Sequence, residues 1–215
     1  MIPLLLQKSD APLKVLCLGS HSDDIEIACG GSILRLLSEH QQIDITWIVF
    51  SSNDEREQEA RKSAELFLRQ AHRKEVIIEH FRDGFFPFDG TKIKDFFESF
   101  KHLSPDLIFS HSRKDAHQDH RALAELTWNT FRNHLILEYE IPKYDGDLGQ
   151  PNFFVPLHES IYKQKVSFLM QAFQTQRSKR WFEEQTFLAL MRLRGMECNA
   201  PSGYAEGFYS RKVVI

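Results

Sequence analysis

A histidine and two acids lie where a short apolar segment of the chain ends. Residues 15–18 form an apolar run typical of a buried parallel strand, and His21, Asp23 and Asp24 follow it closely. In open α/β sheets, ligands bind beyond the carboxyl ends of the strands, so an imidazole and carboxylates placed there form a candidate site. Paired aspartates in a loop are usually solvated and a single histidine is commonly a capping residue, so a second observation is needed.

A second group of polar side chains follows another apolar run, at residues 104–111. His117 and His120 are three positions apart, with Asp119 between them, where a strand gives way to a helix. This is a common metal-ligand geometry, because neutral imidazoles can converge there on one ion. If the two strands are neighbours, the two groups together supply two histidines and one carboxylate. That set is typical of a catalytic zinc site with a position left open for water.

The remaining pattern predicts the elements that would hold these groups. Apolar runs predict further strands at residues 43–50, 76–80, 103–111 and 135–140, an edge strand at 153–156, and a last strand at 204–208 with 212–215. Helical spacing predicts helices at residues 29–40, 92–102, 118–131, 158–173 and 180–194, and another after Asn53. We expect Gly30-Gly31-Ser32 to open the first helix. This alternation predicts an α/β fold, a Rossmann-like three-layer sandwich with a mostly parallel sheet and helices on both faces.

The pair of motifs closely resembles those of the PIG-L/LmbE-like zinc-dependent N-deacetylases. The first motif reads His21-Ser22-Asp23-Asp24 with Gly30-Gly31-Ser32, and the second reads Asp115-Ala116-His117-Gln118-Asp119-His120-Arg121. The usual family forms are His-Pro-Asp-Asp, Gly-Gly-Thr and His-Pro-Asp-His. The chain departs at Ser22, Ser32 and Gln118, none of which is a metal ligand, so the departures concern loop rigidity rather than chemistry.

The resemblance extends over nearly the whole chain and implies one deacetylase domain over residues 1–215. It also covers Arg56, Glu59, Tyr139-Glu140 and Ala205-Glu206-Gly207-Phe208.

The resemblance implies hydrolysis of an acetamide by a zinc-bound water that attacks the amide carbonyl. His21, Asp24 and His120 would bind Zn²⁺, although Fe²⁺ or Co²⁺ could occupy the same ligands, because affinity alone does not select zinc. Zinc lowers the pKa of its bound water to about 7, so a neighbouring carboxylate can complete the deprotonation. Asp23 would be that carboxylate, since one acid could not serve as both ligand and base.

Three further residues receive roles from the resemblance. His117 would stabilise the oxyanion as an imidazolium, and Asp119 would hold it charged and oriented, because a carboxylate partner raises the pKa of a histidine. Asp119 could also cap the following helix. Arg56 either contacts substrate or is a solvated residue of a first helical turn. Spacing gives no role to four further acids, Glu26, Asp83, Asp115 and Glu206.

The implied substrate is a small acetamido sugar of the N-acetylglucosamine type, or its nucleotide, lipid or glycoside conjugate, within carbohydrate metabolism. Two other classes remain open. A magnesium-dependent phosphoryl-transfer enzyme also places paired acids after a first strand, but it would not need the histidines. A non-catalytic sugar- or nucleotide-binding module would keep only the fold. Residues 144–152 lack periodicity and are expected to form a substrate-facing lid loop.

Length and composition limit the remaining choices. The chain has 215 residues and a formal net charge of −3, which fits one domain and gives no basic surface for nucleic acid. Residues 1–10 carry too short an apolar run for a signal peptide, and no segment is long enough to span a membrane. Its three cysteines cannot all pair within the chain, which favours the reducing cytoplasm. The sequence leaves open whether the chain forms a homo-oligomer.

Overall fold

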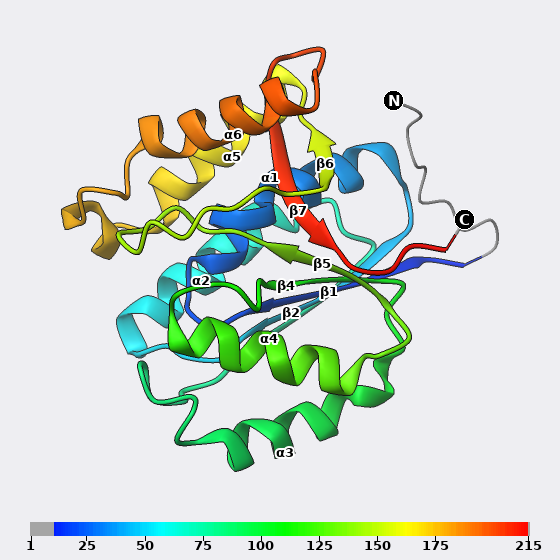
Figure 1. The fold of residues 1–215 in the computed structure, drawn as a ribbon, viewed down its shortest axis with the longest axis vertical. Coiled ribbons are helices and arrows are strands. Elements are labelled where there is room, and N and C mark those ends of the chain that lie inside the picture. The colour runs from blue at the N-terminus through cyan, green and yellow to red at the C-terminus, as the bar shows by residue number, and fades with distance from the viewer. Residues whose placement is uncertain (1–10, 215) are drawn as a thin grey trace.

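The computed structural model describes residues 11–214, which build one seven-stranded sheet with the strand order β3-β2-β1-β4-β5-β7-β6 (Figure 1). The strands are β1 (Leu13–Gly19), β2 (Ile43–Val49), β3 (Arg73–Ile78), β4 (Leu107–His111), β5 (Leu135–Tyr139), β6 (Phe153–Pro156) and β7 (Ala205–Ser210). Strands β1 to β5 run parallel, whereas β7 is antiparallel to both β5 and β6. The prediction of a mostly parallel sheet is confirmed.

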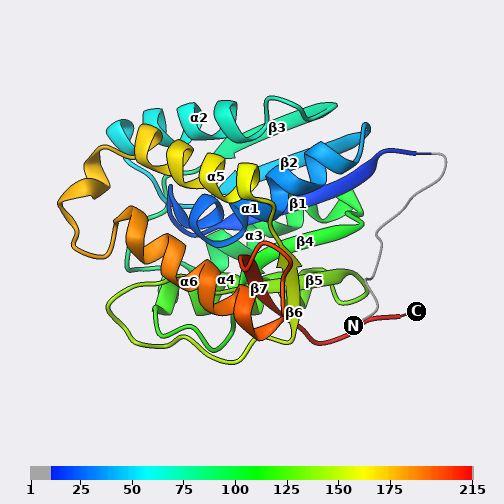
Figure 2. The ribbon, with the colours of Figure 1, turned by 90° about the horizontal axis from the view of Figure 1, so that it is seen from above.

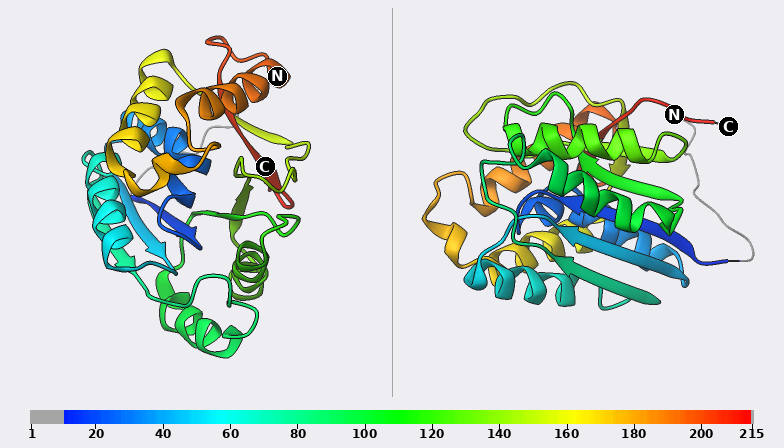
Figure 3. Two further views of the ribbon diagram at one scale, coloured as in Figure 1. Left: turned by 90° about the vertical axis from the view of Figure 1, so that its left-hand side faces the viewer. Right: turned by 90° about the horizontal axis from the view of Figure 1, so that it is seen from below.

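Helices cover both faces of the sheet and complete the three layers. One face carries α1 (Asp24–Glu39), α2 (Asp54–Phe67), α5 (Glu159–Ala172) and α6 (Glu184–Glu197), which lie in front of the strands in Figure 2. The other face carries α3 (Gly90–Phe100) and α4 (Gln118–Thr130), which lie in front of the strands in the right-hand view of Figure 3. Two short 3₁₀ turns complete the elements, at Lys101–Leu103 and Thr175–Ser178. The predicted α/β sandwich is therefore confirmed.

The alternation of side chains along β1 divides the core into two layers. Val15 and Cys17 join the apolar cluster under α1, α2 and α5, and Leu16 and Leu18 join the cluster under α3 and α4. Successive side chains of a strand point to opposite faces, so a strand with helices on both sides needs a continuous apolar run. This explains the uninterrupted apolar run from Val15 to Leu18 in β1.

The strand order reverses at β1, and this reversal locates the site. β2 and β3 lie on one side of β1, and β4 and β5 lie on the other. The pairing of Cys17 with Phe109 brings the carboxyl ends of β1 and β4 side by side. At such a switch point the following loops diverge to opposite faces and leave a crevice. The two sequence motifs meet at this crevice because each follows one of these strands.

Some predicted boundaries are wrong. Helix α1 begins at Asp24, so Gly30 and Gly31 lie inside it rather than opening it. A Cβ at Gly31 would lie 2.6 Å from Leu157 and 2.8 Å from the Glu206 carboxylate, so tight packing rather than a turn requires the glycine. The start of the predicted strand at residues 103–111 forms a 3₁₀ turn and a loop instead, and β4 begins at Leu107.

At the end of the chain, β7 covers residues 205–210, and residues 212–214 are not strand. Residue 215 and the predictions for residues 1–10 lie outside the described part of the chain. The predicted edge strand at residues 153–156 is confirmed as β6, at the end of the sheet. Between residues 11 and 214, none of the helices has the length and apolar character needed to cross a membrane.

Candidate metal centre

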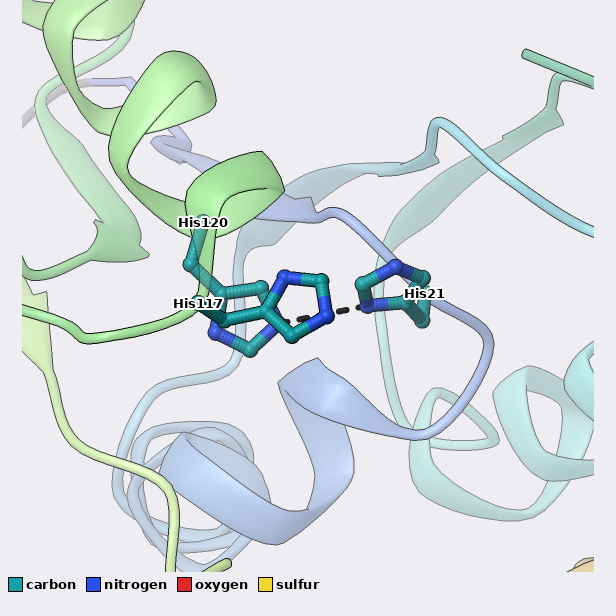
Figure 4. Close-up of side chains that lie close together, drawn as sticks. All are labelled: His21, His117 and His120. Carbon is teal, nitrogen blue, oxygen red and sulfur yellow. Dashed lines mark hydrogen bonds between the residues drawn. The ribbon is translucent and has the colours of Figure 1, made fainter. Parts of the chain in front are cut away.

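Three imidazoles converge at the carboxyl ends of β1 and β4 (Figure 4). His21 comes from the loop between β1 and α1, and His117 and His120 come from the start of α4. His117 is the N-cap residue of α4, and its Nδ1 accepts the backbone N–H of Asp119 at 3.3 Å. The start of α4 therefore directs both of its histidines toward the first motif.

The side-chain atoms of His21, Asp24 and His120 form a compact triangle. His21 Nδ1 lies 3.2 Å from His120 Nε2 and 3.4 Å from Asp24 Oδ2, and His120 Nε2 lies 3.6 Å from Asp24 Oδ2. Three ligand atoms bound tetrahedrally to Zn²⁺ at their usual distances lie roughly 3.3–3.4 Å apart. All three residues are buried. The residues present therefore fit a divalent metal ion of this size.

The local charges prepare Asp24 to act as an anionic ligand. Burial raises the pKa of the Asp24 carboxyl, but the imidazoles of His120, His111 and His21 outweigh burial and hold that pKa well below its ordinary value. The backbone N–H of His21 also donates to Asp24 Oδ2, at 2.7 Å. Burial lowers the pKa of His120, and His111 lowers it further, which favours the neutral imidazole that a metal needs.

The remaining nitrogen of each of the two triangle histidines faces an acid. His21 Nε2 lies 3.0 Å from Asp83 and 3.4 Å from Asp119, and His120 Nδ1 lies 2.9 Å from Asp115. Such carboxylates fix the tautomer and the orientation of a metal-binding imidazole. The hydrogen bond to His21 also lowers the pKa of Asp83 to about 2. Sequence reasoning gave no role to Asp83 or Asp115, because their contacts depend on how the loops fold.

Asp23 lies beside the triangle and pairs with Arg56. The Asp23 side chain is buried, and its Oδ1 accepts a hydrogen bond from Arg56 Nη2 at 2.8 Å. Burial raises the pKa of the Asp23 carboxyl, and the Arg56 guanidinium offsets part of this rise. Arg56 Nε is also buried and has no hydrogen-bond partner among the described residues. Arg56 therefore keeps a free donor beside the two acids of the first motif.

The Asp119 carboxylate raises the pKa of His117, in the predicted direction, but its hydrogen bonds go to other groups. The Asp119 carboxylate accepts the backbone N–H groups of Gly84 at 2.6 Å and Phe86 at 3.1 Å, and it also faces His21. The alternative role as helix cap is wrong, because His117 occupies that position. Asp119 instead fixes the loop between β3 and α3 against the first motif.

The charge state expected of His117 needs correction too. Burial lowers the pKa of His117, and the neighbouring His120 and His21 lower it further. These surroundings favour a neutral imidazole rather than the predicted imidazolium. Because its Nδ1 accepts a backbone N–H, the neutral ring carries its proton on Nε2, where it can serve as a hydrogen-bond donor.

His111, the last residue of β4, is a site residue that sequence reasoning missed. Its Nε2 accepts the backbone N–H of Ser20 at 2.9 Å and lies 3.2 Å from Asp24 Oδ2. Its ring stacks on His120 with a centroid distance of 3.9 Å. Because Ser20 occupies the Nε2 lone pair, His111 supports the triangle rather than joining it. Its position as the last residue of a predicted strand was the available signal.

The three departures from the usual family motifs each form a hydrogen bond. Ser22 Oγ lies 2.9 Å from Ser52 Oγ, and Gln118 Nε2 donates to the carbonyl of Gly84. Ser32 Oγ donates to Glu206 at 2.6 Å. Side-chain hydrogen bonds thus tie the two motif loops to neighbouring segments at the positions where proline is usual.

A cavity of about 460 Å³ lies next to the triangle on the side of β5 and β7. Residues 147–150 of the loop between β5 and β6 line one side of it, and Lys114 and Asp115 line another. Asp115 lies between this cavity and the triangle, because it lines the cavity and also bonds His120. The predicted substrate-facing loop therefore borders a cavity adjacent to the candidate metal centre.

Comparison with solved structures shows the same fold in proteins of different function. A conserved protein of Thermus thermophilus, TT1542, is 20% identical with a TM-score of 0.73, covering 94% of this chain and 96% of that chain. The N,N'-diacetylchitobiose deacetylase of Pyrococcus horikoshii is 20% identical with a TM-score of 0.69, covering 94% and 84%. The 4-carboxy-2-hydroxymuconate hydratase GalB of Pseudomonas putida is 17% identical with a TM-score of 0.73, covering 94% and 98%.

The fold and the site together define an α/β protein with a buried histidine and aspartate centre at the switch point of its sheet. The model of the PIG-L family, described as GlcNAc-PI de-N-acetylase, matches residues 16–131, which is more than half of the chain. The chain belongs to the PIG-L family. The resemblance seen in its motifs is thereby confirmed.

Proposed function

We propose that this chain is a metal-dependent deacetylase that removes the N-acetyl group from an amino sugar or from its nucleotide, lipid or glycoside conjugate. Membership of the PIG-L family supports the reaction class. The observation that carries the proposal is the spacing of His21, Asp24 and His120, which matches the tetrahedral edges of a small divalent ion.

Zn²⁺ is the metal that we propose, with Fe²⁺ and Co²⁺ as alternatives. Two imidazoles and one carboxylate are the donors of catalytic zinc sites, and magnesium would favour oxygen donors throughout. A divalent ion there would lower the pKa of a water and polarise the amide carbonyl. The donor set therefore disfavours the magnesium-dependent phosphoryl-transfer alternative.

Asp23 is proposed as the general base. It follows His21 by two residues and precedes Asp24, yet its carboxylate contacts Arg56 rather than the triangle. A base works best when its pKa lies near the working pH, and burial moves the pKa of Asp23 upward in that direction. Asp23 would take the proton of the attacking water and later return a proton to the departing amine.

His117 and Arg56 are proposed to contact the substrate. The neutral His117 ring presents Nε2–H close to His21 and His120, and a preorganised donor there would stabilise the negative charge that develops on the carbonyl oxygen. The free Nε donor of Arg56 would bind a hydroxyl or an anionic group of the sugar. Asp119 would act by holding His21 and the loop after β3 in place.

The decisive experiment is a screen of acetamido sugars and their nucleotide conjugates for released acetate, with Asp23→Asn as the variant. We expect Asp23→Asn to keep its metal and lose activity by about 10²–10⁴-fold, the usual contribution of a general base. Metal content is measured by elemental analysis alongside turnover. A variant that keeps both metal and full turnover would contradict the role of Asp23.

Acetate release also distinguishes the other functions. A hydratase shares this fold, and water addition to a double bond would release no acetate. A non-catalytic binding module would bind a sugar without any turnover. We further propose that the protein acts in the cytoplasm, in carbohydrate metabolism, which fits its buried and unpaired Cys17, Cys29 and Cys198.

A further inference from the structure

A nearly buried lysine contacts the acid that orients His120. Lys143 lies in the loop after β5, and its side chain is only 9% exposed. Its Nζ lies 3.1 Å from Asp115 Oδ1 and 2.5 Å from Asp147 Oδ2. Lysines are rarely buried unless they are paired, so both contacts are part of how this loop is held.

The Asp115 carboxylate connects Lys143 to the candidate metal centre. Asp115 Oδ2 accepts a hydrogen bond from His120 Nδ1 at 2.9 Å, and Asp115 Oδ1 accepts the backbone N–H of His117 at 2.8 Å. A proton on His120 Nδ1 leaves the lone pair of Nε2 directed at His21 and Asp24. The orientation of this carboxylate therefore determines the orientation of a metal ligand.

Asp147 attaches the same loop to the second motif. Its Oδ2 accepts the backbone N–H of Ala116 at 2.7 Å and pairs with Lys143. Lys143 thus has two separable contacts, one with the acid behind His120 and one with the loop anchor. Asp115 itself is only 5% exposed.

We propose that Lys143 is a positioning residue of the metal centre, acting through Asp115 on His120. This inference rests on the metal site of the proposed function. Lys143 holds the Asp115 carboxylate where it accepts the hydrogen bond from His120 Nδ1. It also balances one negative charge in a region that contains several acids. Its loss removes one of the three contacts that hold the Asp115 carboxylate, and the His120 ring is then held less firmly in the geometry that binds metal.

The test measures metal affinity directly, by titrating the metal-free protein with Zn²⁺ against a chelator and with Co²⁺ by its visible absorption. Lys143→Met is expected to weaken Zn²⁺ binding by about 10–100-fold, the usual effect of losing an outer partner of a metal ligand. Lys143→Arg keeps a cation within reach of Asp115 and is expected to restore most of the affinity. Lys114→Met is the matched control, because it removes the same charge from the residue that directly precedes the second motif.

Two outcomes overturn the proposal. One is a Lys143→Met protein that binds Zn²⁺ as tightly as the wild type. The other is an equal loss of affinity in Lys114→Met or in Asp147→Asn, which would assign the effect to overall charge or to loop attachment. If Lys143→Met does not fold, as judged by thermal unfolding without metal, Lys143→Gln replaces it under the same criteria.

The same titration separates this inference from the proposed function. A wild-type protein that binds neither Zn²⁺ nor Co²⁺ overturns both. A wild-type protein that binds metal but releases no acetate overturns only the deacetylase proposal, and the affinities of the Lys143 variants still decide the role of Lys143.

Discussion

Asp23 and Asp24 are adjacent in the sequence but have opposite electrostatic surroundings. Burial is the largest influence on both pKa values, and it raises each of them. The imidazoles of His120, His111 and His21 outweigh it and lower the pKa of Asp24. For Asp23, Arg56, Lys179 and His21 only partly offset burial, so its pKa stays raised. The two acids are therefore separated in protonation behaviour before any metal binds. This separation is what the division of labour between ligand and base requires.

A third acid close to this motif, Glu26, serves neither role. It is fully buried in α1, and its burial raises its pKa well above the ordinary value of 4.5. An acid with a raised folded-state pKa binds more protons when folded, so its stabilisation is complete below the unfolded pKa and is lost as the pH rises toward the folded pKa.

We therefore expect Glu26→Gln to become more stable than the wild type as the pH rises. Above a pH of about 4.5, the difference in unfolding free energy should grow by about 1.4 kcal/mol per pH unit until Glu26 ionises. Urea unfolding of both metal-free proteins at pH 5, 6 and 7 measures it. Parallel stability curves would show that Glu26 is ionised throughout.

For individual residues, the sequence was sufficient to predict which side chains meet when they directly follow strands. It was insufficient for side chains whose contacts depend on how a loop folds. The two motifs could be predicted to meet because both follow apolar runs in neighbouring strands, and the resemblance to the PIG-L/LmbE-like deacetylases then implied the set His21, Asp24 and His120. The partner of Asp119 could not be predicted, because its carboxylate bonds Gly84 and Phe86, whose loop has no regular pattern. The contact of Lys143 with Asp115 is hidden for the same reason.

Three elements are joined by one buried acid, Glu206 of β7. Its carboxylate accepts the backbone N–H groups of Gly31 at 2.8 Å and Ser32 at 2.6 Å in α1, and it pairs with Lys165 of α5 at 2.6 Å. Lys165 also donates to the carbonyl of Ile27 in α1. The segment of α1 from Ile27 to Ser32 is therefore fixed to both β7 and α5.

We expect Lys165→Met to destabilise the protein by about 3–5 kcal/mol, because it leaves the buried Glu206 without its cation. Chemical unfolding measures the change. Lys163→Met, on the same helix, removes an exposed lysine paired with Glu159 and should leave stability unchanged. A loss in Lys165→Met no larger than in this control would show that the backbone donors alone satisfy Glu206.

The positions of the helices and strands could be predicted from the periodicity of apolar residues, but their first and last residues could not. Strand β6 and most helices lie within a few residues of their predicted positions, because apolar spacing reports which face is buried. The start of α1 was misjudged, because Gly30-Gly31 suggested a helix opening. Those glycines instead allow close contact with Phe67 and Glu206, which only the packed structure reveals.

On the scale of the molecule, the candidate metal centre joins segments that are far apart in the chain. Asp24 and His120 belong to different strand–helix units, and the unfolded chain would not hold them together. A ligand that binds only the folded state stabilises it by mass action. We propose that residues 1–215 form one domain, so this stabilisation should act on the whole chain at once.

We expect Zn²⁺ at about 100 times its dissociation constant to stabilise the protein by about 2.7 kcal/mol, and removal of the metal by a chelator to reverse this. For a chain of this length, that corresponds to an increase in Tm of roughly 5–11 °C in a single calorimetric transition. His120→Ala is the control and should show no such increase. A second unfolding transition whose Tm does not change with Zn²⁺ would contradict the proposal of a single domain.

The position of β7 has a consequence for protein synthesis. Although residues 205–210 come late in the chain, they occupy an interior place in the sheet, between β5 and β6. During synthesis, β6 leaves the ribosome well before β7, the strand with which it pairs. Until β7 emerges, β5 also has an unpaired edge. The nascent chain must therefore delay completion of its sheet until these residues have left the exit tunnel.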